Sequence, residues 1–246
     1  MKRSIAILLS LSFLLSGCAG HNLGGPNIVA MGDSTVQVIA KVGLVLLDAD
    51  GNEIASQSQG WVCSGFVVDK DGGLLAQPRS LIATANHCLD APAVGDRQES
   101  EYGTIVVSFV DFEIRTQDAR VCSLKVERLG DWSIHDVATG VANCDAGPVA
   151  SMAGRAPSRG EKVFVSGHPL GVFPGLVTEG YAAGWTDDGY LLLSAPAFGG
   201  NSGGPVFNSA GEAVGVLVRG SREYPILTLS VPLESLLTRI KESAGW

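Results

Sequence analysis

Short apolar segments separated by turn residues run through most of this chain, and they constrain its fold more than any other feature. The stretch "STVQVIAKVGLVLLDADGNEI" predicts a strand, a turn at Asp50-Gly51 and a second strand. Similar segments follow: "SGFVVD", "SLIATA", "TIVVSFV", "ARVCSLKVERL", "KVFVSG", "GLVTEGYAAGW", "YLLLSAP", "EAVGVLV" and "YPILTLSV". The 32 glycines are dispersed between such segments, which favours many tight turns. We therefore expect an all-β fold.

A polar, proline-containing stretch, "DAGPVASMAGRAPSRGE", divides the strand-rich segments into two halves. Helical spacing appears in the closing stretch "PLESLLTRIKESA", where Leu233, Leu236, Leu237 and Ile240 recur. Two β-barrels or sandwiches with a closing helix are the expected arrangement.

The first residues have the features of an export signal. Lys2 and Arg3 are basic, and Ile5 to Leu15 form a short apolar region. The sequence Leu15-Ser16-Gly17-Cys18 resembles the lipobox of bacterial lipoproteins, which implies cleavage after residue 17 and a lipid on Cys18. An ordinary secretory signal with a chance cysteine is the alternative. We expect a signal peptide at 1–17 and a lipidated, Gly/Asn/Pro-rich tether at 18–33.

The number of cysteines and the net charge indicate the redox compartment and the kind of partner. With Cys18 lipidated, four of the five cysteines remain, an even set that suits an oxidising compartment. Four cysteines allow three connectivities.

The net charge of −8 and the absence of a basic cluster after the signal argue against nucleic acid as a partner. No metal-ligand spacing, phosphate loop or dinucleotide fingerprint occurs, so we expect neither a metal nor a cofactor.

Three local motifs stand in a fixed order. "TANHC" places His87 just after an apolar strand, "HDVATGVA" places Asp136 at the head of another, and "GGNSGGP" places Ser202 in a glycine-rich loop. Asp136 competes with Asp131 and Asp145 for the acidic place in this set. We interpret His21, His135 and His168 as structural.

The order His87, Asp136, Ser202 resembles that of trypsin-like serine peptidases of the chymotrypsin fold. The resemblance implies two six-stranded antiparallel β-barrels in a peptidase domain at 34–246, at about 34–145 and 160–232, with a short helix at about 233–243. It also implies that His87 is the general base, that Asp136 orients it and that Ser202 is the nucleophile. The oxyanion-hole donors would be the amides of Gly200 and Ser202.

The same resemblance pairs Cys63 with Cys88, the residue after the catalytic histidine. Cys122 and Cys144 then form the second pair. A hairpin joining Cys122 and Cys144 would turn in "GDWSI" and bring Asp136 to its open end, opposite Gly130. The disulfide pairing is a hypothesis.

Two features depart from the digestive enzymes of this family. Residue 201 is Asn where many animal members have Asp, so we expect activity without zymogen cleavage. "GNSGGP" and "GHPLG" at 167–171 instead resemble the bacterial HtrA-like branch. Members of that branch usually carry a PDZ domain after the peptidase, and we expect none here.

The resemblance places the substrate pocket in two segments: Pro196, Ala197 and Phe198, and Val218, Arg219 and Gly220. No Asp or Glu lies between Tyr190 and Ser202, so cleavage after Arg or Lys is disfavoured and a small or medium apolar side chain is expected. Arg219 could reach into the pocket and change it.

These observations predict a serine endopeptidase anchored as a lipoprotein in the bacterial envelope. Ala19 follows the lipid cysteine, and the resemblance to lipoproteins without Asp at this place implies the outer membrane, with the domain facing the periplasm. Its partners would be protein or peptide substrates and, through the lipid, the membrane. An inactive peptidase scaffold used for binding is the alternative. Esterase or other acyl-transfer chemistry at the same site is a third hypothesis.

Overall fold

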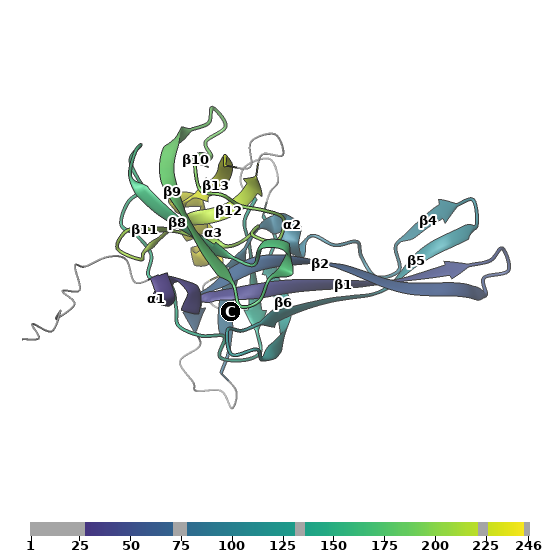
Figure 1. The fold of residues 1–246 in the computed structure, drawn as a ribbon. Coiled ribbons are helices and arrows are strands. Elements are labelled where there is room, and N and C mark those ends of the chain that lie inside the picture. The colour runs from purple at the N-terminus through teal and green to yellow at the C-terminus, as the bar shows by residue number, and fades with distance from the viewer. Residues whose placement is uncertain (1–27, 71–77, 131–135, 221–225, 244–246) are drawn as a thin grey trace, which may run out of the picture.

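The protein folds into two antiparallel β-barrels that lie side by side, with a short helix at the C-terminus (Figure 1). The structure is a computed structural model that describes residues 28–70, 78–130, 136–220 and 226–243. The architecture confirms the expected all-β class and the double barrel with its closing helix. The segment expected to be an export signal, with Cys18 at its end, lies outside the described residues.

The first sheet closes into a barrel through six of its seven strands. Its order is β1-β2-β3-β7-β6-β5-β4, and β1 also pairs with β5, which leaves β4 outside the ring. Phe66, Ile82 and Ile114 point inward and are completely buried. The strands are β1 (Thr35–Leu47), β2 (Glu53–Lys70), β3 (Ser80–Thr84), β4 (Arg97–Ser100), β5 (Gly103–Arg115), β6 (Val121–Arg128) and β7 (Ala138–Ala142).

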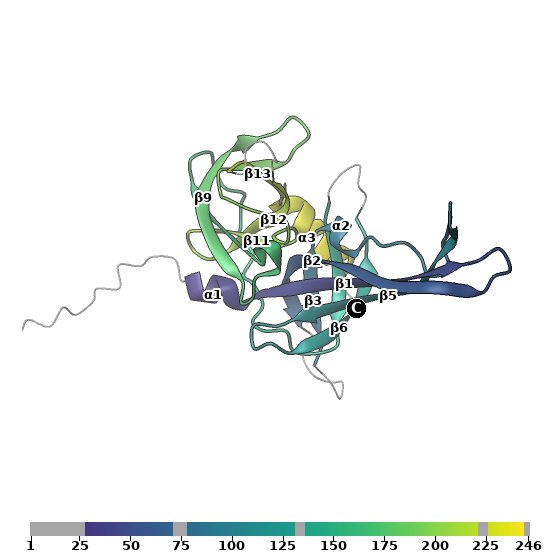
Figure 2. The same ribbon diagram turned by 45° about the vertical axis from the view of Figure 1, so that its right-hand side comes forward.

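Three of these strands are longer than the barrel requires. β1 and β5 have 13 residues each and β2 has 18, whereas strands usually have 3 to 10. The excess length projects from the barrel as an arm made of β1, β2, β4 and β5 (Figures 1 and 2). The segment "SGFVVD" is therefore the inner part of β2 rather than a strand of its own.

The second barrel is formed by the segments after the polar linker. Its closed order is β10-β13-β12-β11-β8-β9. Leu191, Leu193 and Val206 fill its interior and are completely buried. The strands are β8 (Lys162–Gly167), β9 (Leu176–Trp185), β10 (Leu191–Leu193), β11 (Pro205–Asn208), β12 (Ala213–Gly220) and β13 (Thr228–Pro232).

The C-terminal helix contacts both barrels. α3 (Leu233–Glu242) contacts β7 of the first barrel and β12 and β13 of the second, and it buries Leu233 and Leu236. One cluster of buried apolar side chains spans both barrels, with Phe66 from the first and Phe164 and Phe207 from the second. In the described part of the chain, no helix is long and apolar enough to cross a membrane.

The end of the segment predicted as a tether is folded. Residues Ile28–Asp33 form α1, which packs against β8 and β9. Met31 is only 2% exposed, and the Gln117 side chain donates to the Gly32 carbonyl. The Gly/Asn/Pro-rich composition suggested a tether up to residue 33, but burial of the Met31 side chain fixes residues 28–33 on the domain.

Both pairs of cysteines expected to bond are joined in the first barrel. Cys63 bonds Cys88, and Cys122 bonds Cys144. β6 and β7 form the expected hairpin, with Leu124 opposite Ala142 and Val126 opposite Gly140. The register then shifts by one residue, and the last pair is Arg128 with Thr139. The turn of this hairpin lies largely outside the described residues, and no pairing of Asp136 with Gly130 is described.

Candidate active site

His87 lies at the end of β3, in the short helix α2 (Asn86–Leu89). Asp136 precedes β7, which pairs with β3, so the two residues meet at the same end of the barrel. The Asp136 carboxylate accepts two hydrogen bonds from His87: Oδ2 lies 2.6 Å from the ring Nδ1, and Oδ1 lies 3.0 Å from the backbone nitrogen. These contacts favour the tautomer in which Nδ1 carries the proton and Nε2 carries the lone pair that a base needs.

The Asp136 carboxylate is shielded from water, since the residue is 7% exposed. Tyr190 lies near it, and the Asp136 backbone forms a hydrogen bond with the Tyr190 hydroxyl. Burial raises the pKa of the Tyr190 phenol, and the charge of Asp136 adds to this effect. Sequence reasoning did not single out Tyr190, because nothing in its local sequence indicates a contact with a residue 54 positions earlier. The competing Asp145 forms an ion pair with Lys70 instead.

Ser202 lies in the loop before β11, and its backbone is held against the histidine segment. Its carbonyl accepts the Ser64 N–H at 2.7 Å and lies 3.6 Å from the Cys88 sulfur. Gly203 follows in the left-handed region, at φ +85°, and a Cβ there would lie 2.1 Å from the Ser64 carbonyl oxygen. Only glycine permits this close approach, so the glycine-rich loop is required to bring the Ser202 backbone next to Cys88, the residue after His87.

The backbone before Ser202 forms a tight turn. Asn201 donates its N–H to the Phe198 carbonyl at 3.0 Å, and Gly200 adopts a φ of +100°. Among the described residues, neither the Gly200 N–H nor the Ser202 N–H has an acceptor. Two backbone donors are therefore available on either side of Asn201, as binding of an oxyanion requires.

The Ser202 hydroxyl makes no hydrogen bond to another residue of the described segments. In sites without substrate, such bonds are often long and shorten only when the substrate is bound. The Ser202 hydroxyl and the His87 ring are therefore candidates for a nucleophile and its base.

The segments expected to form the substrate pocket lie next to each other. A Cβ on Gly220 would be 3.4 Å from the Ala197 carbonyl oxygen. Ala197 and Val218 are buried, Pro196 is partly buried, and Phe198, Arg219 and Gly220 are exposed. The Thr178 hydroxyl donates a hydrogen bond to the Pro196 carbonyl oxygen at 2.9 Å. These positions contain no carboxylate, so a basic side chain of a substrate would find no partner among them.

Two polar side chains beside the serine loop are completely or almost completely buried. Asn201 is 3% exposed and its Oδ1 has no partner in the described part of the protein. His168, interpreted from sequence as structural, is 0% exposed and stacks on Phe173. Burial lowers the pKa of His168 to about 4, and the charge of Arg115 contributes. His168 is therefore neutral at pH 7.

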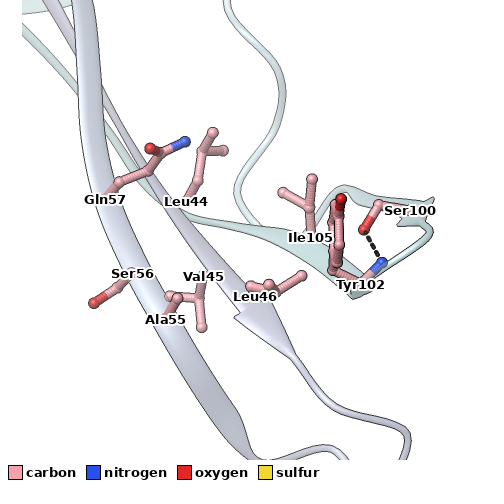
Figure 3. A pocket seen from close by; sticks show the side chains of 9 residues that line it. All are labelled: Leu44, Val45, Leu46, Ala55, Ser56, Gln57, Ser100, Tyr102 and Ile105. Carbon is pink, nitrogen blue, oxygen red and sulfur yellow. Dashed lines mark hydrogen bonds between the residues drawn. The ribbon is translucent and has the colours of Figure 1, made fainter.

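A side-chain cluster and a hollow outside the serine loop have the size of ligand sites. Cys63, His87 and Cys88 lie close enough to hold a metal, but both sulfurs are committed to a disulfide bond. A hollow of about 290 Å³ lies in the arm (Figure 3), and neither His87 nor Asp136 is among its lining residues. Its lining is mostly apolar, with Tyr102 its only titratable group. Its lining contains no candidate nucleophile paired with a base.

Three residues discussed in the sequence analysis lie outside the described residues: His21, Asp131 and His135.

Comparison with known proteins supports the assignment of the fold and family. The family model of the trypsin-like peptidase domain matches residues 63–216, more than half of the chain. Among solved structures, the crystal structure of the serine endoprotease from Yersinia pestis is similar in fold, with a TM-score of 0.57 at 20% sequence identity. The match covers 86% of this chain and 62% of that chain, so this chain spans less than two thirds of its length. A search of curated proteins found no significant match.

Proposed function

The chain belongs to the trypsin-like peptidase family, and on that premise we propose that it is a serine endopeptidase acting through an acyl-enzyme on Ser202. One observation carries the proposal: Asp136 orients His87 through two hydrogen bonds, beside a serine loop with two N–H donors that have no acceptor among the described residues. Each part of a serine-nucleophile mechanism thus has a residue to perform it.

In the proposed reaction, His87 Nε2 takes the proton of the Ser202 hydroxyl as its oxygen attacks the substrate carbonyl carbon. The amides of Gly200 and Ser202 then stabilise the negative charge on the carbonyl oxygen. His87 returns the proton to the leaving amine, and the peptide bond breaks to leave an ester on Ser202. Water, deprotonated by His87, hydrolyses that ester. Asp136 stabilises the imidazolium that forms in both halves of the reaction.

The substrate side chain before the cleaved bond would lie between Ala197 and Gly220. We propose that small or medium apolar side chains are preferred, because these segments supply no negative charge. Digestion of a peptide library, with cleavage sites read by mass spectrometry, tests this preference. Dominant cleavage after Lys or Arg would contradict it.

For location, the proposal is attachment to the bacterial envelope by a lipid on Cys18, with the domain facing the periplasm. Its support is the sequence alone: the basic start, the apolar stretch and Leu15-Ser16-Gly17-Cys18. Metabolic labelling with an alkyne fatty acid in a bacterial host tests it, with Cys18→Ser as the control. Equal labelling of both proteins would contradict lipidation.

One observation favours the alternative of an inactive scaffold, namely that the Ser202 hydroxyl makes no hydrogen bond within the described segments. Labelling of the oxidised, folded domain with a fluorophosphonate probe separates the two functions. The proposal expects labelling of wild type and none of Ser202→Ala or His87→Ala. An unlabelled wild type would leave binding as the function of the site.

A further inference from the structure

Ser64 lies in the first barrel, but the hydrogen bonds of its hydroxyl with other described residues are all made with the second barrel. It lies on β2, next to the disulfide-bonded Cys63, and is completely buried. Its hydroxyl donates to the Gly200 carbonyl at 2.8 Å and accepts the His168 N–H at 2.8 Å. The backbone N–H of Ser64 also donates to the Ser202 carbonyl. One residue thus contacts both ends of the segment that carries the oxyanion donors.

The direction of the Gly200 N–H depends on the form of the turn from Phe198 to Asn201. With Gly200 at φ +100°, the turn has the positive φ at its third residue that type II requires. In the type I form, the peptide between Gly199 and Gly200 is reversed, so the Gly200 N–H points the opposite way. Glycine at both central positions makes either form accessible. Contacts from outside the turn must therefore select one form.

Those contacts come from the loop that follows β8. The Leu170 N–H donates to the Gly199 carbonyl at 2.6 Å, and a planar trans peptide then points the Gly200 N–H the other way. Leu170 itself has a φ of +54°, unusual for a residue with a side chain. Leu170 lies in the short 3-10 helix η1 (Pro169–Gly171), and this helix starts directly after His168, whose N–H is bound by Ser64.

We propose that Ser64 is a positioning residue of the oxyanion hole. Its hydroxyl ties the start of η1, through His168, to the Gly200 carbonyl, which keeps the Leu170 N–H within reach of Gly199. The Gly200 N–H is thereby aimed into the site. This inference rests on the proposed function, since it assigns Ser64 a part in the reaction on Ser202.

A purely structural role for Ser64 makes a different prediction, and the protein offers a matched control. The Thr35 hydroxyl donates to the Ser166 hydroxyl at 2.8 Å, a second buried hydrogen bond between the barrels. Thr35→Val removes that bond without touching the turn or η1. Loss of either hydroxyl leaves a buried group without its partner and should lower the melting temperature to a similar extent.

The experiment measures the rate constant and the half-saturation concentration for inactivation by a fluorophosphonate probe. In this reaction the Ser202 oxygen bonds to phosphorus, the P–F bond breaks, fluoride leaves with the electron pair, and His87 takes the hydroxyl proton. Charge developing on the phosphoryl oxygen needs the two N–H donors. For Ser64→Ala we expect the rate constant to fall about 10- to 100-fold with little change in half-saturation, since loss of one donor costs about 100- to 1,000-fold.

Thr35→Val should retain the wild-type rate constant within about twofold at a similar loss of melting temperature. Equal rate constants for Ser64→Ala and Thr35→Val would overturn the inference while leaving the proposed function intact. A wild type that does not react would overturn both. If Ser64→Ala does not fold, the isosteric pair Ser64→Thr and Ser64→Val provides the same comparison. A rate constant higher for Thr than for Val supports the inference, and equal rate constants contradict it.

Discussion

Asp136 binds His87 at two points, the ring Nδ1 at 2.6 Å and the backbone nitrogen at 3.0 Å. A single carboxylate therefore fixes both the position of α2 and the orientation of the imidazole on it. Because the residue is 7% exposed, water competes little for either hydrogen bond. The base of the proposed reaction is thus oriented before any substrate arrives.

Replacing Asp136 by Asn should reduce kcat roughly 10⁴-fold, because an amide that donates to Nδ1 favours the wrong imidazole tautomer. Peptide hydrolysis at pH 7 measures the effect. Asp145→Asn is the matched control, since Asp145 pairs with Lys70 away from His87 and should retain kcat within about twofold. Similar losses in both variants would argue against the assigned role of Asp136.

Gly200→Ala should lower kcat by roughly 100- to 1,000-fold with little change in KM, as expected for loss of one oxyanion donor. Gly200 has a φ of +100°, and a Cβ there would lie 2.4 Å from the His168 carbonyl oxygen, so the turn must move. Gly189→Ala is the control, because Gly189 has a φ of +85° with nothing within 4 Å of the added Cβ. It should lose stability through backbone strain but keep its kcat.

The two disulfides should differ in their effect on activity. Replacing Cys122 and Cys144 by Ala should lower the free energy of unfolding by about 3 kcal/mol and leave kcat unchanged. Replacing Cys63 and Cys88 should cost similar stability but also reduce kcat, because Ser64 and His87 adjoin these cysteines and Cys88 contacts the Ser202 carbonyl. Urea unfolding and peptide hydrolysis provide the two measurements. An equal kcat in the two double variants would contradict the distinction.

Stability should fall as the pH drops from 7 to 5, and His168 should account for part of this loss. Burial, together with Arg115, lowers its pKa in the folded protein from 6.5 to about 4. As the pH falls, the His168 ring is therefore protonated near pH 6.5 in the unfolded chain but only near pH 4 in the folded protein. The stabilisation is fully present above pH 6.5 and declines by about 1.4 kcal/mol per pH unit below it, or about 2 kcal/mol at pH 5.

His168→Asn removes the titrating ring. The loss of unfolding free energy between pH 7 and pH 5 should therefore be smaller in this variant by about 2 kcal/mol. Urea unfolding at pH 7 and at pH 5 tests this, and the window stays above the range in which the carboxylates with lowered pKa values titrate. An unchanged difference between the two pH values in the variant would show that His168 does not contribute.

Much of the fold could be predicted because its signals are local. Apolar segments bounded by turn residues indicated the strands, and Leu233 to Ile240 indicated the closing helix that the structure forms at α3. The arm could not be predicted, since the sequence of β2 does not reveal that its first half, from Glu53 to Gly60, lies outside the barrel. β11 was missed because "PVFN" directly follows the glycine-rich loop and is only four residues long.

The sequence by itself determined the chemical groups and their order: His87, Asp136, Ser202 and the glycines around the serine. It also indicated which cysteines would bond, through the resemblance carried by those motifs. The tertiary structure alone decided that Met31 is buried, that Tyr190 lies beside Asp136, and that Ser64 holds the turn at Gly200. Ser64 and Gly200 are 136 residues apart, in different barrels. No local pattern encodes such a contact, because it exists only after the two barrels have packed against each other.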